Sequence, residues 1–274
     1  MPIARDMDTF PEVLRRFDAH LQAIGRAEGT RRTYRYELTR FWCDHCAPAA
    51  LDILCVRESD VEAYLAALPP RGSKRADASR ALKAFYGWCE GRVSEQNPAA
   101  RVHIPRSRLS TAPHLPPDHI RVLLSAAFRK ESRRGWAIML ALATGARIGS
   151  LVALRASDID FERSWVQFRI TKGDRPYGLP LSRQGLIACK HLNAARRATL
   201  VGVGAPGFRV WVHDAQRDAG LDRVWPHLLR HEFSNRVAAK GDPEAWRQAM
   251  NHVDLSQWAR YVAASDERLR AAVT

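Results

Sequence analysis

The segment His227-Leu228-Leu229-Arg230-His231 places an imidazole and a guanidinium three residues apart near the start of a predicted helix. Pro226 comes directly before it, and proline is favoured in a first helical turn because its missing N–H would have no partner there. Residues three apart lie on one face of a helix, so His227 and Arg230 present their donors side by side close to a helix N-terminus. This arrangement is suited to binding a phosphate group.

The same segment also has a spacing that occurs in helical zinc sites. His227 and His231 are four residues apart, and Glu232 follows them. The glutamate lies outside the histidine pair, however, and not between its members as in His-Glu-x-x-His metal sites. A short His-x-x-Arg is also frequent by chance, so the choice between phosphate and metal chemistry depends on the rest of the chain.

The composition favours a polyanionic partner. The 274-residue chain has 43 Lys and Arg against 29 Asp and Glu, a formal net charge of +14. Such an excess points to nucleic acid first and to an anionic membrane surface second. The hydrophobic fraction of 46% is ample for packed cores, so we expect one large domain or two ordinary ones.

The sequence has no signal for a membrane or for an oxidising compartment. No stretch approaches the roughly 18 apolar residues that span a bilayer, and no apolar signal-peptide core follows Met1. Five cysteines are an odd number, which argues against a closed disulfide framework. Cys43 and Cys46 flank His45, but no second pair lies at zinc spacing, so we expect no metal there. These features predict a cytoplasmic, nucleoid-associated protein without a membrane partner.

The first half of the chain is expected to be helical throughout. Apolar residues recur at helical spacing from Pro11 to Ile24, Gly25 ends this run, and Thr30 is expected to cap the next helix. Five prolines and several basic residues then punctuate a stretch that breaks regular structure. We therefore predict a helical domain over residues 1–95, a basic proline-rich linker over 96–116 and a second domain over 117–274.

The second half combines helices with one hairpin. Trp136 to Ala143 is apolar nearly all round and predicts a buried central helix, after which Arg147 is presented from a glycine-containing turn. Residues 165–170 alternate as in a strand, 171–175 form a turn that includes Lys172, and 177–181 return the chain. The expected fold class is mainly α with a small antiparallel sheet.

Polar residues at these turns and helix starts occur in a definite order: Arg147, Lys172, His227, Arg230, His252 and Tyr261. The set resembles that of the tyrosine site-specific recombinases, the phage integrase family, over most of the chain. Thr144–Arg155 is similar to the first arginine box of the family, and the hairpin turn to the one with its catalytic lysine. The segment around Arg230 is similar to its second box, and His252 with Tyr261 to its third histidine and nucleophile.

The N-terminal half extends this resemblance. Residues 30–41, Phe85-Tyr86-Gly87-Trp88 and Asn97-Pro98-Ala99-Ala100 look like the SAM-like core-binding domain of Xer-type members. Two positions depart from the pattern. Ser150 stands where many relatives have a carboxylate, so the support of Arg147 is expected to differ, and Asn251 replaces a usual glycine before His252.

The resemblance implies site-specific recombination (integration, excision or resolution), as in mobile elements. Strands would be cleaved and rejoined without a metal or cofactor through a 3′-phosphotyrosyl intermediate. Double-stranded DNA would be the partner of a homotetramer, with accessory DNA-bending proteins as further partners. Two alternatives stay open: a catalytically silent DNA-binding regulator of the same fold, and a metal-dependent hydrolase built on His227 and His231.

Each residue type suits the implied chemistry. Arg147 and Arg230 can clamp the charge that gathers on the phosphate oxygens while Tyr261 attacks. His227 is expected to accept a proton or orient the phosphate, and His252 to donate a hydrogen bond to it. Lys172 can protonate the leaving 5′-hydroxyl. Three other candidate side chains are expected to be structural: Tyr177, His191 and His231.

Overall fold

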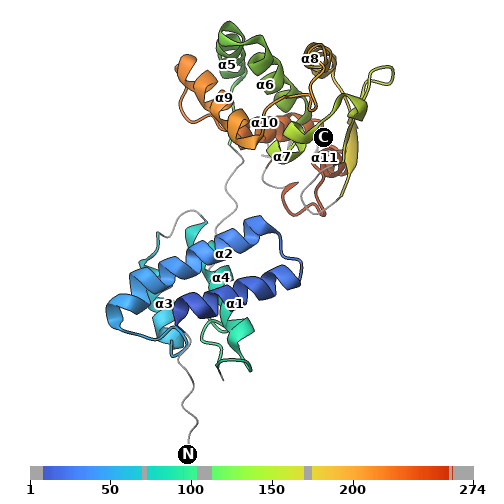
Figure 1. Ribbon diagram of the computed structural model, residues 1–274. Coiled ribbons are helices and arrows are strands. Elements are labelled where there is room, and N and C mark those ends of the chain that lie inside the picture. Colours follow the sequence, from blue (N-terminus) through green and yellow to red (C-terminus); the bar gives the residue numbers. More distant parts are fainter. Residues whose placement is uncertain are drawn as a thin grey trace, which may run out of the picture. The chain divides into compact units, whose positions relative to one another are not determined.

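The computed structural model of the chain describes residues 9–69, 73–94, 96–103, 113–169, 175–258 and 261. The chain divides into two compact units, Met1–Arg108 and Leu109–Thr274 (Figure 1). Each unit has a hydrophobic core of its own. Within the described ranges, no helix has the length and apolar character that crossing a membrane requires.

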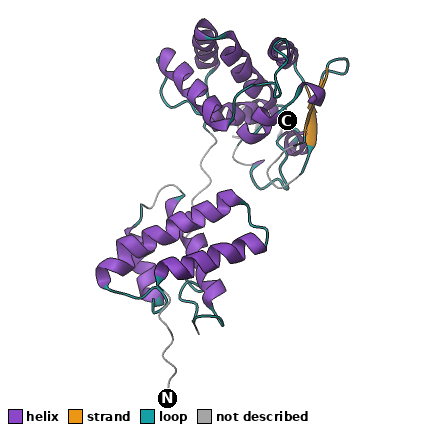
Figure 2. Ribbon diagram, viewed as in Figure 1, coloured by secondary structure: helices purple, strands orange, loops and turns teal. Residues whose placement is uncertain are grey.

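The described elements of the first unit are helices, in agreement with the sequence-based expectation (Figure 2). They are α1 (Phe10–Ala23), α2 (Glu28–Phe41), η1 (Trp42–Cys46), η2 (Ala47–Ala49), α3 (Glu58–Ala67) and α4 (Lys74–Cys89). Their core is rich in aromatic side chains; the rings of Phe17 and Phe85, for example, meet edge to face at 5.4 Å. Ala99 and Val102, from the stretch predicted as linker, belong to the same core.

The start of α2 differs from the prediction that Thr30 caps it. The helix begins at Glu28 after Ala27, so Thr30 lies within its first turn. Ion pairs favour the earlier start, because Glu28 in the first turn lies 3.1 Å from Nη1 of Arg31 and accepts a hydrogen bond from Arg35 at 2.8 Å. Glu28 also lies at the positive end of the helix dipole, where a carboxylate is favourable.

The second unit combines helices with one three-stranded antiparallel sheet, which confirms the predicted fold class (Figure 2). Its elements are α5 (Pro117–Lys130), α6 (Ser132–Thr144), α7 (Ile148–Ala153), η3 (Ala156–Asp158), β1 (Ile159–Asp160), β2 (Trp165–Phe168), β3 (Tyr177–Pro180), α8 (Arg183–Asn193), α9 (Ala205–Asp218), α10 (Pro226–Ala238) and α11 (Pro243–Ala249). Val166 of β2 pairs with Ile159 on one side and with Leu179 on the other. The two-residue strand β1 was not predicted, because it is too short to show an alternating pattern.

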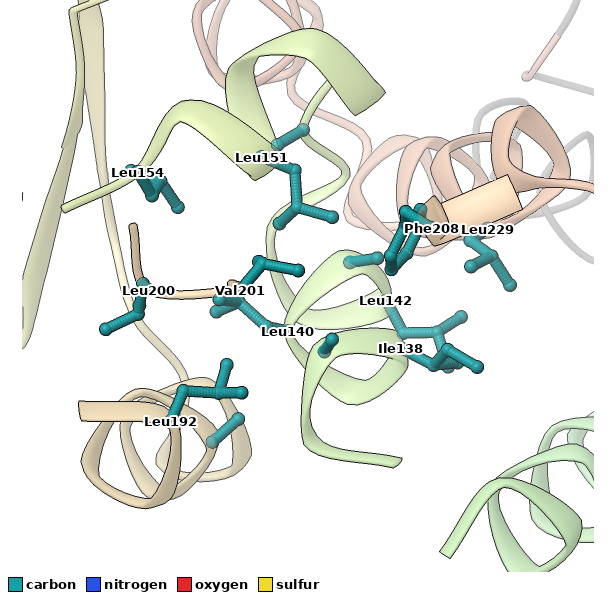
Figure 3. Close-up of a cluster of buried hydrophobic side chains, with 14 of the residues drawn as sticks. Ile138, Leu140, Leu142, Leu151, Leu154, Leu192, Leu200, Val201, Phe208 and Leu229 are labelled. Carbon is teal, nitrogen blue, oxygen red and sulfur yellow. The ribbon is translucent and has the colours of Figure 1, made fainter. Parts of the chain in front are cut away.

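Helix α6 is the centre of the second unit, as its apolar composition predicts. It packs against α5, α8 and α10. Ile138 and Leu140 are fully buried, and Figure 3 shows them among leucines from α7, α8 and α10. Each such side chain contributes roughly 1.5–3 kcal/mol on burial, so the position of α6 is firmly fixed. The turn that follows α6 therefore presents Arg147 from a rigid base.

Candidate active site

Arg230 is the buried centre of the site. It lies in the second turn of α10 and is only 3% exposed. Its Nη1 donates to the carbonyl of Gly145 at 2.7 Å, and its Nη2 donates to the carbonyl of Met250 at 2.6 Å. One guanidinium thus joins the end of α6 to the end of α11.

Arg147 reaches the same place from the other side. Gly145 ends α6 in the left-handed region with a φ of 58°, and a Cβ there would collide with the ring of Phe233. Only glycine allows this close turn, after which Arg147 becomes the residue before α7. Its Nη2 lies 3.5 Å from the carbonyl oxygen of Asn251. The two arginines therefore converge on the carbonyls of consecutive residues.

The electrostatics of the pair are unfavourable without a bound anion. Burial first, and then the charge of Arg147, lower the pKa of Arg230 to about 10. Two guanidiniums that oppose each other's charge in a desolvated site attract a negative group strongly. A phosphate that binds here would relieve this repulsion.

His252 lies in the segment that both arginines contact. Its ring is partly buried against Trp246, with the centroids 5.0 Å apart. Burial first, and then the charges of Arg230 and Arg147, lower the pKa of His252 to about 4. The imidazole is therefore neutral at pH 7 and retains one N–H that can donate to a phosphate oxygen.

Asn251 has a backbone conformation that explains its presence. Its φ is 46°, in the left-handed region, where asparagine is the residue best tolerated after glycine. Its side-chain Nδ2 also donates to the carbonyl of Arg175 at 3.0 Å. The substitution for the usual glycine thus preserves the turn and connects it to the residues before β3. Ser150, the other departure, is 5% exposed in the first turn of α7.

Tyr261 lies against α10 and α11. Its ring centroid is 5.5 Å from that of Trp246, and its hydroxyl oxygen is 2.8 Å from Nδ1 of His231. His231 is 9% exposed, whereas His227, one turn earlier on α10, is exposed. The two histidine rings meet edge to face at 4.6 Å. His231, which was expected to be structural, is thus the histidine that contacts the tyrosine hydroxyl.

The other expected residues fall into two groups. Lys172 lies outside the described residues, between the ends of β2 and β3. Tyr177 is packed as expected, with its ring stacked on Phe168 at 4.9 Å, and burial raises the pKa of its phenol. His191, also expected to be structural, stacks on Trp136 at 4.1 Å.

The metal hypothesis requires at least a third ligand beside His227 and His231. Among the residues that the structure describes, no three His, Cys, Asp or Glu side chains gather in a way that could hold a metal ion. Glu232, the nearest acid in sequence, instead accepts from the backbone N of Leu115 at 3.3 Å and lies 3.0 Å from Nδ1 of His114. Its carboxylate thus holds the segment before α5.

This geometry agrees with a family comparison. The model of the phage integrase family matches residues 113–268, more than half of the chain and the whole of the site described here. The chain therefore belongs to the phage integrase family.

Two curated relatives narrow the class. The chain is 26% identical over 278 residues to tyrosine recombinase XerA of Pyrococcus furiosus, covering 96% of this chain and 93% of the relative. It is 27% identical over 278 residues to tyrosine recombinase XerC of Chromobacterium violaceum, covering 94% and 92%. These similarities make it a Xer-like tyrosine recombinase.

Solved structures have the same fold. The Tn1549 transposon integrase, in complex with a circular intermediate DNA, superposes with a TM-score of 0.74 at 18% identity, covering 95% of this chain and 98% of that one. The XerH recombinase, bound to its difH substrate, gives a TM-score of 0.70 at 17% identity, covering 96% and 84%.

Proposed function

We propose that this recombinase cleaves and rejoins double-stranded DNA at specific sites, with Tyr261 as nucleophile and a 3′-phosphotyrosyl intermediate. The observation that carries the proposal is the convergence of Arg147 and Arg230 on the carbonyls of Asn251 and Met250. The hydroxyl of Tyr261 belongs to the same site, since it is held by the residue next to Arg230 on α10. The relatives named above, a transposon integrase and XerH, are bound to DNA in their structures.

The two arginines stabilise the transition state in this proposal. Attack by a phenol oxygen concentrates negative charge on the non-bridging oxygens of the phosphodiester, and fixed cations in a water-poor site lower the energy of that state. Guanidiniums are suited to this task because they form paired hydrogen bonds to a phosphate. Arg230 is already oriented by its two carbonyl partners, so little reorganisation is needed during the reaction.

The other residues of the proposed active site donate protons or hydrogen bonds and orient the phosphate. His252, neutral at pH 7, donates its N–H to a non-bridging oxygen. His227, exposed in the first turn of α10, orients the phosphate. Lys172 donates a proton to the leaving 5′-oxygen. The phenol of Tyr261 ends as a phosphodiester, which conserves the energy of the broken bond for rejoining.

We also infer that the active form is a homotetramer on two DNA sites. Exchange of two duplexes requires four strand cleavages, and one nucleophile in each of four protomers supplies them. We infer as well that accessory DNA-bending proteins are further partners and that the protein associates with the nucleoid. The net charge of +14 supports a polyanionic partner.

The test requires a DNA site, which selection provides. The protein is incubated with a pool of random-sequence duplexes, and DNA that stays attached after denaturation is amplified and sequenced. A duplex with the selected site is then made with a nick next to the cleavage point, so that the short leaving strand diffuses away and traps the intermediate. We expect a denaturation-resistant adduct with the wild-type protein, whether or not a chelator is present.

Matched variants decide between the candidate functions. Tyr261→Phe removes one hydroxyl and should abolish the adduct while DNA binding persists, whereas Tyr177→Phe should retain it. Specific binding by the wild-type protein without any adduct would instead favour the catalytically silent regulator. Loss of cleavage on addition of a chelator would favour a metal-dependent hydrolase on His227 and His231.

A further inference from the structure

We propose that His231 accepts the phenolic proton of Tyr261 during strand cleavage and returns it during rejoining. This inference rests on the proposed function and assigns a step in it to a residue for which the sequence indicated only a structural part. The observation is the 2.8 Å separation between Nδ1 of His231 and the hydroxyl oxygen of Tyr261, a normal hydrogen-bond length.

The surroundings favour a proton acceptor at this position. His231 is 9% exposed, so water competes little for its Nδ1. Trp246 of α11 packs against the ring of Tyr261 at a centroid distance of 5.5 Å and limits where the phenol can lie. Helix α10 is fixed in turn by Trp246, whose Nε1 donates to Oγ of Ser234 at 2.7 Å. The nucleophile and its acceptor are therefore held by the same two helices.

The geometry separates the tasks of the two histidines. His227 is exposed in the first turn of α10, where a phosphate would bind. His231 lies one turn later on the same helix and contacts the hydroxyl of Tyr261. With their rings 4.6 Å apart, a proton taken by His231 lies close to a second imidazole that is open to solvent. His227 therefore faces the phosphate, and His231 serves the nucleophile.

The step balances in atoms and charge. The oxygen of Tyr261 forms a bond to phosphorus, and the bond from phosphorus to the 5′-oxygen breaks. The phenolic proton moves to Nδ1 of His231, which becomes an imidazolium, and the leaving 5′-oxygen takes a proton from the separate donor proposed above. Rejoining reverses each transfer. The imidazole must therefore begin neutral, with Nδ1 unprotonated.

Two substitutions of His231 separate proton transfer from positioning. His231→Ala removes both, whereas His231→Asn places an amide oxygen near the position of Nδ1 and can accept the hydrogen bond without taking up the proton. We expect both variants to cleave the nicked duplex about 10²–10⁴-fold more slowly in single turnover with saturating protein, the range for loss of a general base. Their DNA affinity should stay within about threefold of wild type, because His231 does not contact DNA in this proposal.

The pH profile supplies a readout that a structural role would not change. Without its acceptor the phenol must lose its proton to solvent before it attacks, so the cleavage rate of the variants should rise with pH between pH 7 and 9. The wild-type rate should rise less over this range, because His231 takes up the proton in place of solvent. Among the described residues, the ionisable groups in contact with the pair include His227 on the same helix and Arg230, whose charge interacts with Tyr261. Both are present in every variant.

His213→Ala is the matched control, since this histidine is exposed on α9 in the same unit. Its rate and pH profile should equal those of wild type. Melting temperatures verify folding, and if His231→Ala does not fold, the asparagine variant decides. Cleavage by His231→Asn within tenfold of wild type, or a variant profile as flat as that of wild type, would overturn the inference while the adduct on Tyr261 still stands. Absence of any wild-type adduct would instead overturn the proposed function.

Discussion

At the scale of single residues, the site brings two positive charges together, those of Arg147 and Arg230. Arg230 and Arg147 oppose each other's charge, and together they help to keep His252 neutral. Such an arrangement of charges favours the binding of an anion, and it lowers the stability of the protein when no anion is bound. The same charges should therefore be visible in the stability of the protein without DNA.

The pKa of His252 predicts how stability changes with pH. It is about 4 in the folded protein, against a reference value of 6.5. Between these values the unfolded chain binds the proton and the folded chain does not, so stability falls as the pH falls from about 6.5 to 4. His252→Gln removes this contribution. Its melting temperature should therefore decline less than that of wild type between pH 7 and 4.5, and equal declines would contradict the assignment.

At the scale of elements, the turn between α6 and α7 determines where Arg147 lies. Gly145 combines a φ of 58° with a position where a Cβ would collide with Phe233 of α10. A methyl group at position 145 would therefore disturb both the turn at the end of α6 and the packing of this turn against α10.

Two glycine substitutions test this dependence. Gly145→Ala should lower the free energy of unfolding by roughly 2–4 kcal/mol, the combined cost of a left-handed backbone and an overpacked contact. It should also reduce cleavage, because Arg147 would shift. Gly149→Ala is the control, since an added methyl in α7 would have no atom within 4 Å, and it should be neutral or stabilise by about 0.5–1 kcal/mol. Similar denaturant midpoints for the two variants would contradict the account.

Sequence patterns predicted these elements unevenly. The apolar run of α6 and the alternation of β2 follow from local periodicity, so their types and places were predicted well. The start of α2 was not, because it follows Ala27, a residue that is not a usual helix cap. The contact of His231 with Tyr261 joins residues 30 apart in the chain, and no local pattern carries that information. Only its spacing of four residues from His227 was available as a signal.

At the scale of the whole molecule, the formal net charge of +14 is the dominant property. For a DNA-binding enzyme, such an excess supplies much of the affinity through contacts with phosphates and release of counterions. The arginine-rich composition also favours paired hydrogen bonds over diffuse attraction.

Affinity for the selected duplex should therefore depend steeply on salt. If the protein neutralises about six to ten phosphates, affinity should fall about 10³–10⁵-fold between 50 and 200 mM salt. Fluorescence anisotropy with a labelled duplex measures the slope, and Tyr261→Phe should give the same slope because a phenol hydroxyl carries no charge. An affinity that changes less than tenfold over this range would contradict a phosphate-dominated interface.

The central claim is that the oxygen of Tyr261 becomes joined to DNA, and one measurement tests it most directly. The adduct trapped on the nicked duplex is digested with protease and nuclease, and mass spectrometry locates the nucleotide that stays attached. The account predicts a single modified residue, Tyr261, linked to a 3′-phosphate, and no modification when Tyr261 is replaced by phenylalanine. DNA attached to any other side chain, or through a 5′-phosphate, would contradict it.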